Sequence, residues 1–185
     1  YGQDNPTFSL RASNTGGGSN SQMGISQAAF STLATSESDV GEYDVSASGI
    51  SNSNFAFNYV AGTLKINPVD LTISIDNATR QYGDMNPDFN ATVSGLVAGD
   101  SIDDAVDQYA LVTSANQSSN VGQYAVTVGG TVSSNYNASI DNGILTLTKA
   151  PLSLVSADSV SRHYGDANPA FTLSATGLKN GDLAS

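Results

Sequence analysis

The residues best suited to chemistry in this chain are carboxylates. The 185-residue sequence holds 15 Asp and 2 Glu, but no Cys and a single His. Carboxylates can act as general acids or bases, and they bind hard cations such as calcium. Because Cys is absent, the chain has no thiolate nucleophile and no disulfide. Because it has a single His, a metal site built from several histidines is excluded as well.

Two short segments concentrate these oxygen ligands. In the first, Asp84, Asn86 and Asp88 alternate as in the first half of an EF-hand calcium loop. That loop needs Gly at its sixth position and Glu at its twelfth, where this sequence has Phe89 and Gly95. The template for a calcium loop is therefore not met.

The second segment is an acidic cluster, Asp100, Asp103, Asp104 and Asp107. An exposed cluster of this kind could hold Ca²⁺ weakly, but runs of charge are more often solvated faces. We favour an acidic helix face. We predict no cofactor and no confident metal site, and keep weak calcium binding by these four residues as the alternative.

Other motifs show that the chain is a tandem repeat. An octapeptide of the form Tyr-Gly-x-x-Asn-Pro-x-Phe begins at Tyr1, Tyr82 and Tyr164, so the intervals are 81 and 82 residues. The tetrapeptide Val-Gly-x-Tyr at 40–43 returns at 121–124, again 81 residues later. Agreement between separate landmarks predicts an array of similar units rather than one globule.

This register predicts three parts: a partial repeat at 1–67 that lacks its first strand, a complete repeat at 68–149, and the N-terminal part of a third at 150–185. Pro68 and Pro151 stand at the two junctions, where a fixed φ and a missing N–H favour a stiff joint. We expect neighbouring repeats to be partners and the array to form a rod. We also expect head-to-tail strand exchange between fragments, because the strand at 152–155 matches the one missing from the first repeat.

Within the complete repeat the apolar residues alternate with polar ones, as at 71–75 and 89–94, which predicts half-buried strands. Asn142-Gly143 between two such runs predicts a hairpin. The segment 99–107 predicts one short helix with Asp100 as its N-cap. The expected fold is mainly β, with small domains of about 81 residues; it is β-grasp-like, or alternatively an immunoglobulin-like sandwich.

We interpret the recurring octapeptide as structural, because Gly, Asp, Asn and Pro in a row are what a tight turn between strands requires. The residues assigned this role are Tyr1, Gly2, Asn5, Pro6, Tyr82, Gly83, Asp84, Asn86, Pro87, Tyr164, Gly165, Asp166, Asn168 and Pro169.

Comparison between the copies argues against catalysis. His163 stands where the second copy has Gln81, and the complete repeat contains no His, so a Ser-His-Asp arrangement cannot occur in every unit. Arg80 and Arg162 occupy matching positions, and we predict that each forms a structural ion pair with a nearby Asp. We predict that the chain is not an enzyme.

The segment from Leu71 to Phe89, together with Gly-Leu-x-x-Gly-Asp at 95–100, Val-Gly-x-Tyr at 121–124 and Ser-Asn-Tyr at 134–136, resembles the MBG domain of the Tyr-Gly-x type. That family occurs as tandem repeats in very large bacterial surface and secreted proteins, including adhesins and filamentous-haemagglutinin-like exoproteins. The resemblance implies an extracellular, mainly-β domain at the cell surface or in a secreted protein. It implies no catalytic residues.

Two functions follow. In the first, the units are structural stalk repeats of a large surface adhesin that contributes to cell-surface or biofilm adhesion, and their acidity keeps a long array soluble. In the second, exposed aromatic residues such as Tyr59 or Tyr109 bind a glycan or matrix protein directly; calcium stiffening of the rod is a further alternative. The net charge of −11 argues against nucleic acid as a partner, and no apolar run suits membrane insertion.

Overall fold

The computed structural model describes residues 1–10, 25–156 and 159–183, and these form two compact units. The first unit comprises 1–71, 94–107 and 131–139; the second comprises 72–93, 108–130 and 140–185. Each unit therefore combines one flanking copy of the repeat with segments of the middle copy. The boundaries at 67 and 149 that we expect from the sequence remain predictions.

The first copy forms an antiparallel sheet in the order β1-β2-β3, preceded by a 3₁₀ turn. The elements are η1 (Ile25–Gln27), β1 (Ala29–Ser31), β2 (Gly41–Ser48) and β3 (Gly62–Ile66). In β2, exposed residues alternate with less exposed ones, the pattern of a strand with one covered face. Val45, at 8% exposure, is its most buried residue.

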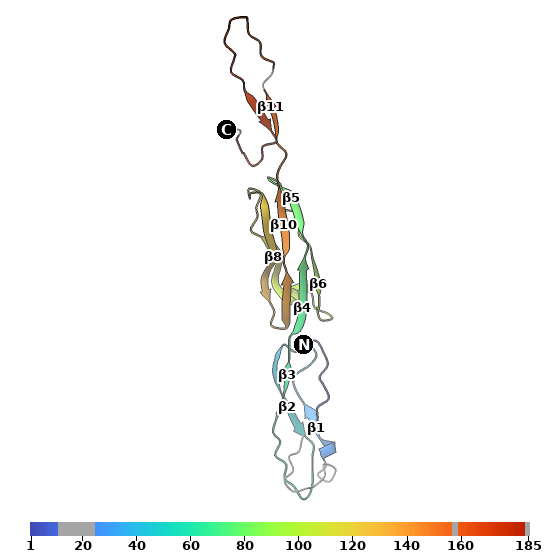
Figure 1. The fold of residues 1–185 in the computed structure, drawn as a ribbon. Coiled ribbons are helices and arrows are strands. Elements are labelled where there is room, and N and C mark those ends of the chain that lie inside the picture. The colour runs from blue at the N-terminus through green and yellow to red at the C-terminus, as the bar shows by residue number, and fades with distance from the viewer. Residues whose placement is uncertain (11–24, 157–158, 184–185) are drawn as a thin grey trace. The chain divides into compact units, whose positions relative to one another are not determined.

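Seven strands and one helix make up the middle copy. They are β4 (Val69–Ile75), β5 (Ala78–Gln81), β6 (Ala91–Ser94), α1 (Ile102–Ala105), β7 (Val106–Thr113), β8 (Gly122–Val132), β9 (Tyr136–Asp141) and β10 (Gly143–Thr148). They form a four-stranded sheet, β5-β10-β8-β7, and a three-stranded sheet, β6-β4-β9. Strand β10 pairs in parallel with β5 and antiparallel with β8, and lies between them (Figure 1).

The buried residues of the middle copy come from both sheets. Leu71, Ile73 and Leu145 are fully buried, as are Val106 and Val126. In β4 and β10 the buried positions alternate, so one face of each strand supplies the core. This confirms the mainly-β fold, and two sheets of three and four strands are the arrangement that the sandwich alternative anticipates.

The prediction of a hairpin at Asn142-Gly143 is wrong. Strands β9 and β10 flank that dipeptide but belong to different sheets, and neither residue has the positive φ that a two-residue hairpin turn needs. Gly143 is required for another reason: an added Cβ would lie 2.6 Å from the carbonyl oxygen of Asp76. The dipeptide moves the chain from one sheet to the other.

The short helix is present, but its N-cap differs from the prediction. Ser101 is the N-cap of α1, and the carboxylate of Asp104 accepts hydrogen bonds from the amide and hydroxyl of Ser101, at 2.8 and 2.7 Å. These two bonds lower the pKa of Asp104. Asp100 is thereby left for a different contact, described below.

In the third copy, β11 (Ser153–Ser156) pairs antiparallel with β12 (Leu173–Thr176). The strand that we expect to exchange between fragments thus has a neighbour within its own chain. The described part of the chain includes no helix with the length and hydropathy to cross a membrane.

Candidate functional site

The Tyr-Gly octapeptide begins with a tight turn. In the second copy the amide of Asp84 donates to the carbonyl of Gln81, at 3.2 Å, and Gly83 has a φ of +85°. Glycine adopts this left-handed conformation without the steric cost that other residues meet. The equivalent glycines Gly2 and Gly165 have φ values of +71° and +91°, so the turn is intrinsic to the motif.

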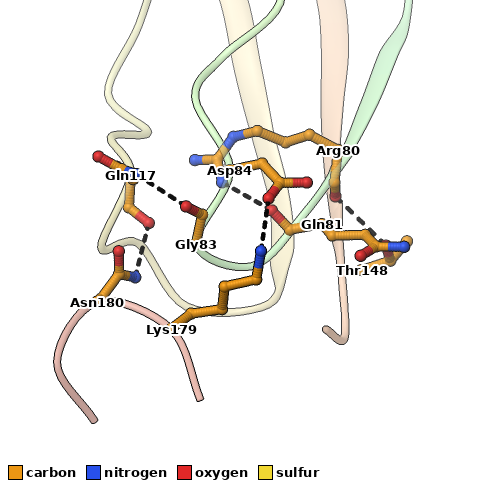
Figure 2. Close-up of polar contacts among 8 residues, drawn as sticks. All are labelled: Arg80, Gln81, Gly83, Asp84, Gln117, Thr148, Lys179 and Asn180. Carbon is orange, nitrogen blue, oxygen red and sulfur yellow. Dashed lines mark hydrogen bonds and ion pairs between the residues drawn. The ribbon is translucent and has the colours of Figure 1, made fainter. Parts of the chain in front are cut away.

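The asparagine of the motif ties this turn to a neighbouring loop. Arg80 is buried, and its Nε donates to the side-chain oxygen of Asn86 at 2.7 Å, while Asn86 Nδ2 donates to the carbonyl of Ala115 at 2.8 Å. A second guanidinium nitrogen of Arg80 donates to the carbonyl of Asn116 at 2.6 Å. A third donates to the carbonyl of Gln81 at 3.2 Å, as Figure 2 shows. All the guanidinium bonds therefore go to neutral oxygens.

This finding corrects the ion pair that we expect for Arg80 and Arg162. Arg162 Nε likewise donates to Asn168, at 2.8 Å, and within the described part of the chain neither arginine is paired with a carboxylate. In the first copy Asn5 donates to the carbonyl of Ala34, at 2.6 Å, as Asn86 does to Ala115. The motif asparagine is a structural bridge that recurs.

The motif tyrosine of the first copy reaches into the middle copy. Tyr1 Oη donates a hydrogen bond to Asp100 Oδ2, at 3.0 Å, and the hydroxyl of Tyr136 donates to the same oxygen. The two rings meet edge to face, with centroids 5.7 Å apart. Tyr136 also accepts a bond from the amide of Val97, at 3.1 Å, so its buried hydroxyl is fully used.

Electrostatics at this contact keep both phenols protonated. Burial, followed by the hydrogen bond to Asp100, raises the pKa of Tyr136 to about 12. The same two causes raise the pKa of Tyr1. Both phenols donate to Oδ2 of Asp100, so this oxygen has two defined donors and the carboxylate has a structural role at the junction.

Two further contacts complete this first junction. The backbone of Gly2 lies against Val97: a Cβ added to the glycine would be 2.3 Å from a methyl carbon of that valine. Asn135, which is buried, donates to the carboxylate of Asp39 and accepts from the amide of Val40, both at 2.8 Å.

The second junction repeats the arrangement. Tyr82 Oη donates to the carboxylate of Asp182, at 3.4 Å, and a Cβ added to Gly83 would be 2.4 Å from Lys179 Cβ. Asp182 is the counterpart of Asp100, and Lys179 of Val97, each 82 residues further on. The Tyr-Gly dipeptide of one copy therefore contacts the Gly-Leu-x-x-Gly-Asp segment of the next copy at both junctions.

A family comparison identifies these copies. The family model of the MBG domain, YGX type, matches residues 1–65, 71–146 and 154–185. The chain belongs to the MBG domain family. No curated protein and no solved structure matches it. This confirms the resemblance drawn from the motifs, and with it the coarse placement of the chain among repeat domains of large surface proteins.

The third MBG copy provides an internal comparison for the Tyr-Gly turn. Tyr164 is fully exposed, and a Cβ added to Gly165 would meet nothing within 4 Å. In the equivalent turn of the second copy, by contrast, Tyr82 is half-buried and Gly83 is buried. At the first and second junctions, the Gly-Leu-x-x-Gly-Asp segment of the following copy is what covers the Tyr-Gly dipeptide.

The acidic cluster is not assembled as a metal site. No group of three or more acidic or histidine side chains in the described ranges is placed to hold a metal ion. Asp100 accepts from Tyr1 and Tyr136, and Asp104 from Ser101, so two of the four carboxylates have defined structural roles. Asp103 and Asp107 are exposed.

His163 lies fully exposed beside the carboxylate of Asp166, with 3.6 Å between Nδ1 and Oδ2. It is a surface residue next to its own turn, as the comparison with Gln81 suggests.

Sequence reasoning missed the residues that receive the motif. Val97 and Lys179 share no chemistry, and only their common position directly after a Gly-Leu dipeptide could have linked them. Asn135 and Tyr136 belong to a Ser-Asn-Tyr landmark of the family resemblance, but nothing in the sequence indicates that they reach the preceding copy.

Proposed function

We propose that this chain is an extracellular stalk section of a large bacterial surface adhesin, in which MBG copies join end to end and carry an adhesive part away from the cell. The observation that carries the proposal is the recurrence of one joint: Tyr1 with Asp100, and Tyr82 with Asp182. A module that works alone has no need to place its most regular motif against the next copy.

Composition supports the same function. The net charge of −11 is spread along an array whose charge grows with each added copy, and such charge keeps long β proteins soluble and apart. The turn and the joint recur between the copies of this chain, whereas the surface residues of the copies vary. This combination is typical of repeats whose task is to connect.

Relaxation measurements by NMR on the full 185-residue chain test the stalk function. We expect residues 25–67 and 69–148 to share one rotational correlation time, because the joint holds consecutive copies together. The control is Tyr1→Ala/Gly2→Val, which removes the tyrosine and fills the space of the glycine. Separate tumbling of the two segments in the unmodified chain would overturn the proposal.

A second candidate function is glycan or protein binding, and one observation favours a place for it. Tyr109 is half-buried and lines an open hollow of about 480 Å³ together with 87–91 and 110–111. Tyr59 is a weaker candidate, because its hydroxyl is bonded to both the amide and the carbonyl of Ile50, at 3.0 and 3.1 Å. Binding on a glycan array that Tyr109→Ala abolishes and Tyr59→Phe preserves would support this function; an array that stays silent would remove it.

A further inference from the structure

The two joints share a Tyr–Asp bond but differ in the residues around it. At the second joint Lys179 Nζ lies 3.2 Å from Asp84 Oδ1, next to the glycine contact (Figure 2). At the first joint the corresponding residues are Val97 and Gln3, neither of which carries a charge. The third residue of the motif and the residue that packs on its glycine thus change together.

A second contact at this joint has no side-chain counterpart at the first joint. Asn180 donates from its side chain to the carbonyl of Gln117, at 3.0 Å, and Gln117 donates to the carbonyl of Gly83, at 2.9 Å (Figure 2). The corresponding residues at the first joint are Ala98 and Ser36, and Ala98 has no side-chain donor. Lys179 thus contacts a side chain of the preceding copy, whereas Asn180 contacts a main-chain carbonyl that any residue at 117 would present.

We propose that this dipeptide, Val97-Ala98 in one copy and Lys179-Asn180 in the next, is the specificity element that determines which MBG copy can follow which. A motif with Asp at its third position, as at Asp84, fits a following copy with Lys after Gly-Leu. A motif with a neutral residue there, as at Gln3, fits an apolar one. This proposal rests on the stalk function and adds a rule for the order of its units.

The physical basis is selection rather than strength. The side chains of Lys179 and Asp84 are 39% and 46% exposed, so solvent screens their attraction. A following copy with a mismatched charge changes the stability of the joint more than the matched pair does, because two like charges at this distance repel. The contact with Gly83 leaves the residue at 179 little room to move away. Opposite charges at the joint thus mainly exclude wrong neighbours.

Charge exchange at the second joint tests the proposal in the full chain. The readout is the amide chemical shift of residues 177–182. The shifts of the unmodified chain represent the docked third copy and those of Tyr82→Ala/Gly83→Val the undocked one, so the shift of any other variant between these two values gives its docked fraction. Each of Asp84→Lys and Lys179→Asp places two like charges at the joint, so each should lower the ratio of docked to undocked third copy by at least about two- to fivefold. Asp84→Lys/Lys179→Asp should restore it, which a purely steric role would not do.

Transfer of the pair to the first joint provides the matched control. Val97→Lys alone should loosen the contact with Gly2, and Gln3→Asp/Val97→Lys should recover it. If the reference variant undocks the third copy but the exchanged pair is not rescued, the specificity rule is overturned and the joint stands. If the reference variant leaves the shifts of 177–182 unchanged, the joint and the stalk function both fail.

Discussion

The hydroxyl of Tyr1 donates a hydrogen bond to the carboxylate of Asp100, 99 positions away along the chain and in the next copy of the repeat. Tyr82 and Asp182 repeat this relationship one copy later, with a longer distance of 3.4 Å. A contact that recurs with the period of the sequence explains why tyrosine leads the motif: the side chain is long enough to leave its own copy and has a polar tip for the carboxylate of the next.

Removal of the shared acceptor should destabilise the first joint. We expect Asp100→Ala to cost about 1–3 kcal/mol in the free energy of unfolding, because the buried hydroxyl of Tyr136 loses the acceptor of its proton. Urea denaturation followed by tyrosine fluorescence measures this. Asp103→Ala is the matched control: Asp103 is an exposed carboxylate three residues further on, in α1, and its removal should change stability by less than about 0.5 kcal/mol.

The asparagine bridge offers a second test. Asn86→Ala leaves the buried Arg80 without its Nε acceptor and the carbonyl of Ala115 without its donor, so we expect a loss of about 1–3 kcal/mol. Asn86→Asp keeps the acceptor, adds a charge beside the guanidinium and loses only the donor; its cost should be smaller. Equal losses in both variants would show that the bond to Arg80 contributes nothing.

More of the fold than of the site could be predicted from the sequence. Period-two alternation places β4 and β10 because each strand buries one face, and the turn glycines follow from a local requirement for positive φ. The Asn142-Gly143 hairpin failed because the dipeptide is a local signal, whereas the choice of sheet for β9 and β10 depends on residues far along the chain. The receiving positions, Val97 and Lys179, show no shared pattern because the glycine opposite them accepts either side chain.

The motif glycine should be sensitive to substitution for two separable reasons. Gly83→Ala meets both a positive φ and the Cβ of Lys179, whereas Gly99→Ala meets a positive φ of +104° in open space. A non-glycine residue in the left-handed region costs about 1–2 kcal/mol. We expect Gly99→Ala to lose about that amount in urea denaturation and Gly83→Ala to lose more; an equal loss would mean that the contact with Lys179 is loose.

Calcium should not change the stability of this chain. Asp100 and Asp104 are already occupied by hydroxyl donors, and in the ranges that the structure describes no three acidic side chains converge. We expect the same thermal midpoint in millimolar calcium and in chelator, because a ligand that binds the native state would raise it. A higher midpoint in calcium that Asp103→Asn/Asp107→Asn removes would instead locate a site in the acidic cluster.

The first joint should weaken at high pH, and the sign follows from the raised pKa of Tyr136. The folded-state value is about 12 against 10.0 for an unperturbed phenol, so the folded chain holds this proton more tightly than the unfolded chain does. The resulting stability is fully present below pH 10 and is lost as the pH rises from 10 towards 12.

Thermal midpoints recorded across that range should therefore fall more steeply in the unmodified chain than in Tyr136→Phe, which has no proton to lose. Tyrosinate absorbance gives an independent check: Tyr136→Phe should remove one late-titrating tyrosine. If Tyr136→Phe and the unmodified chain lose stability in parallel, the phenol of Tyr136 is not held against Asp100 in solution.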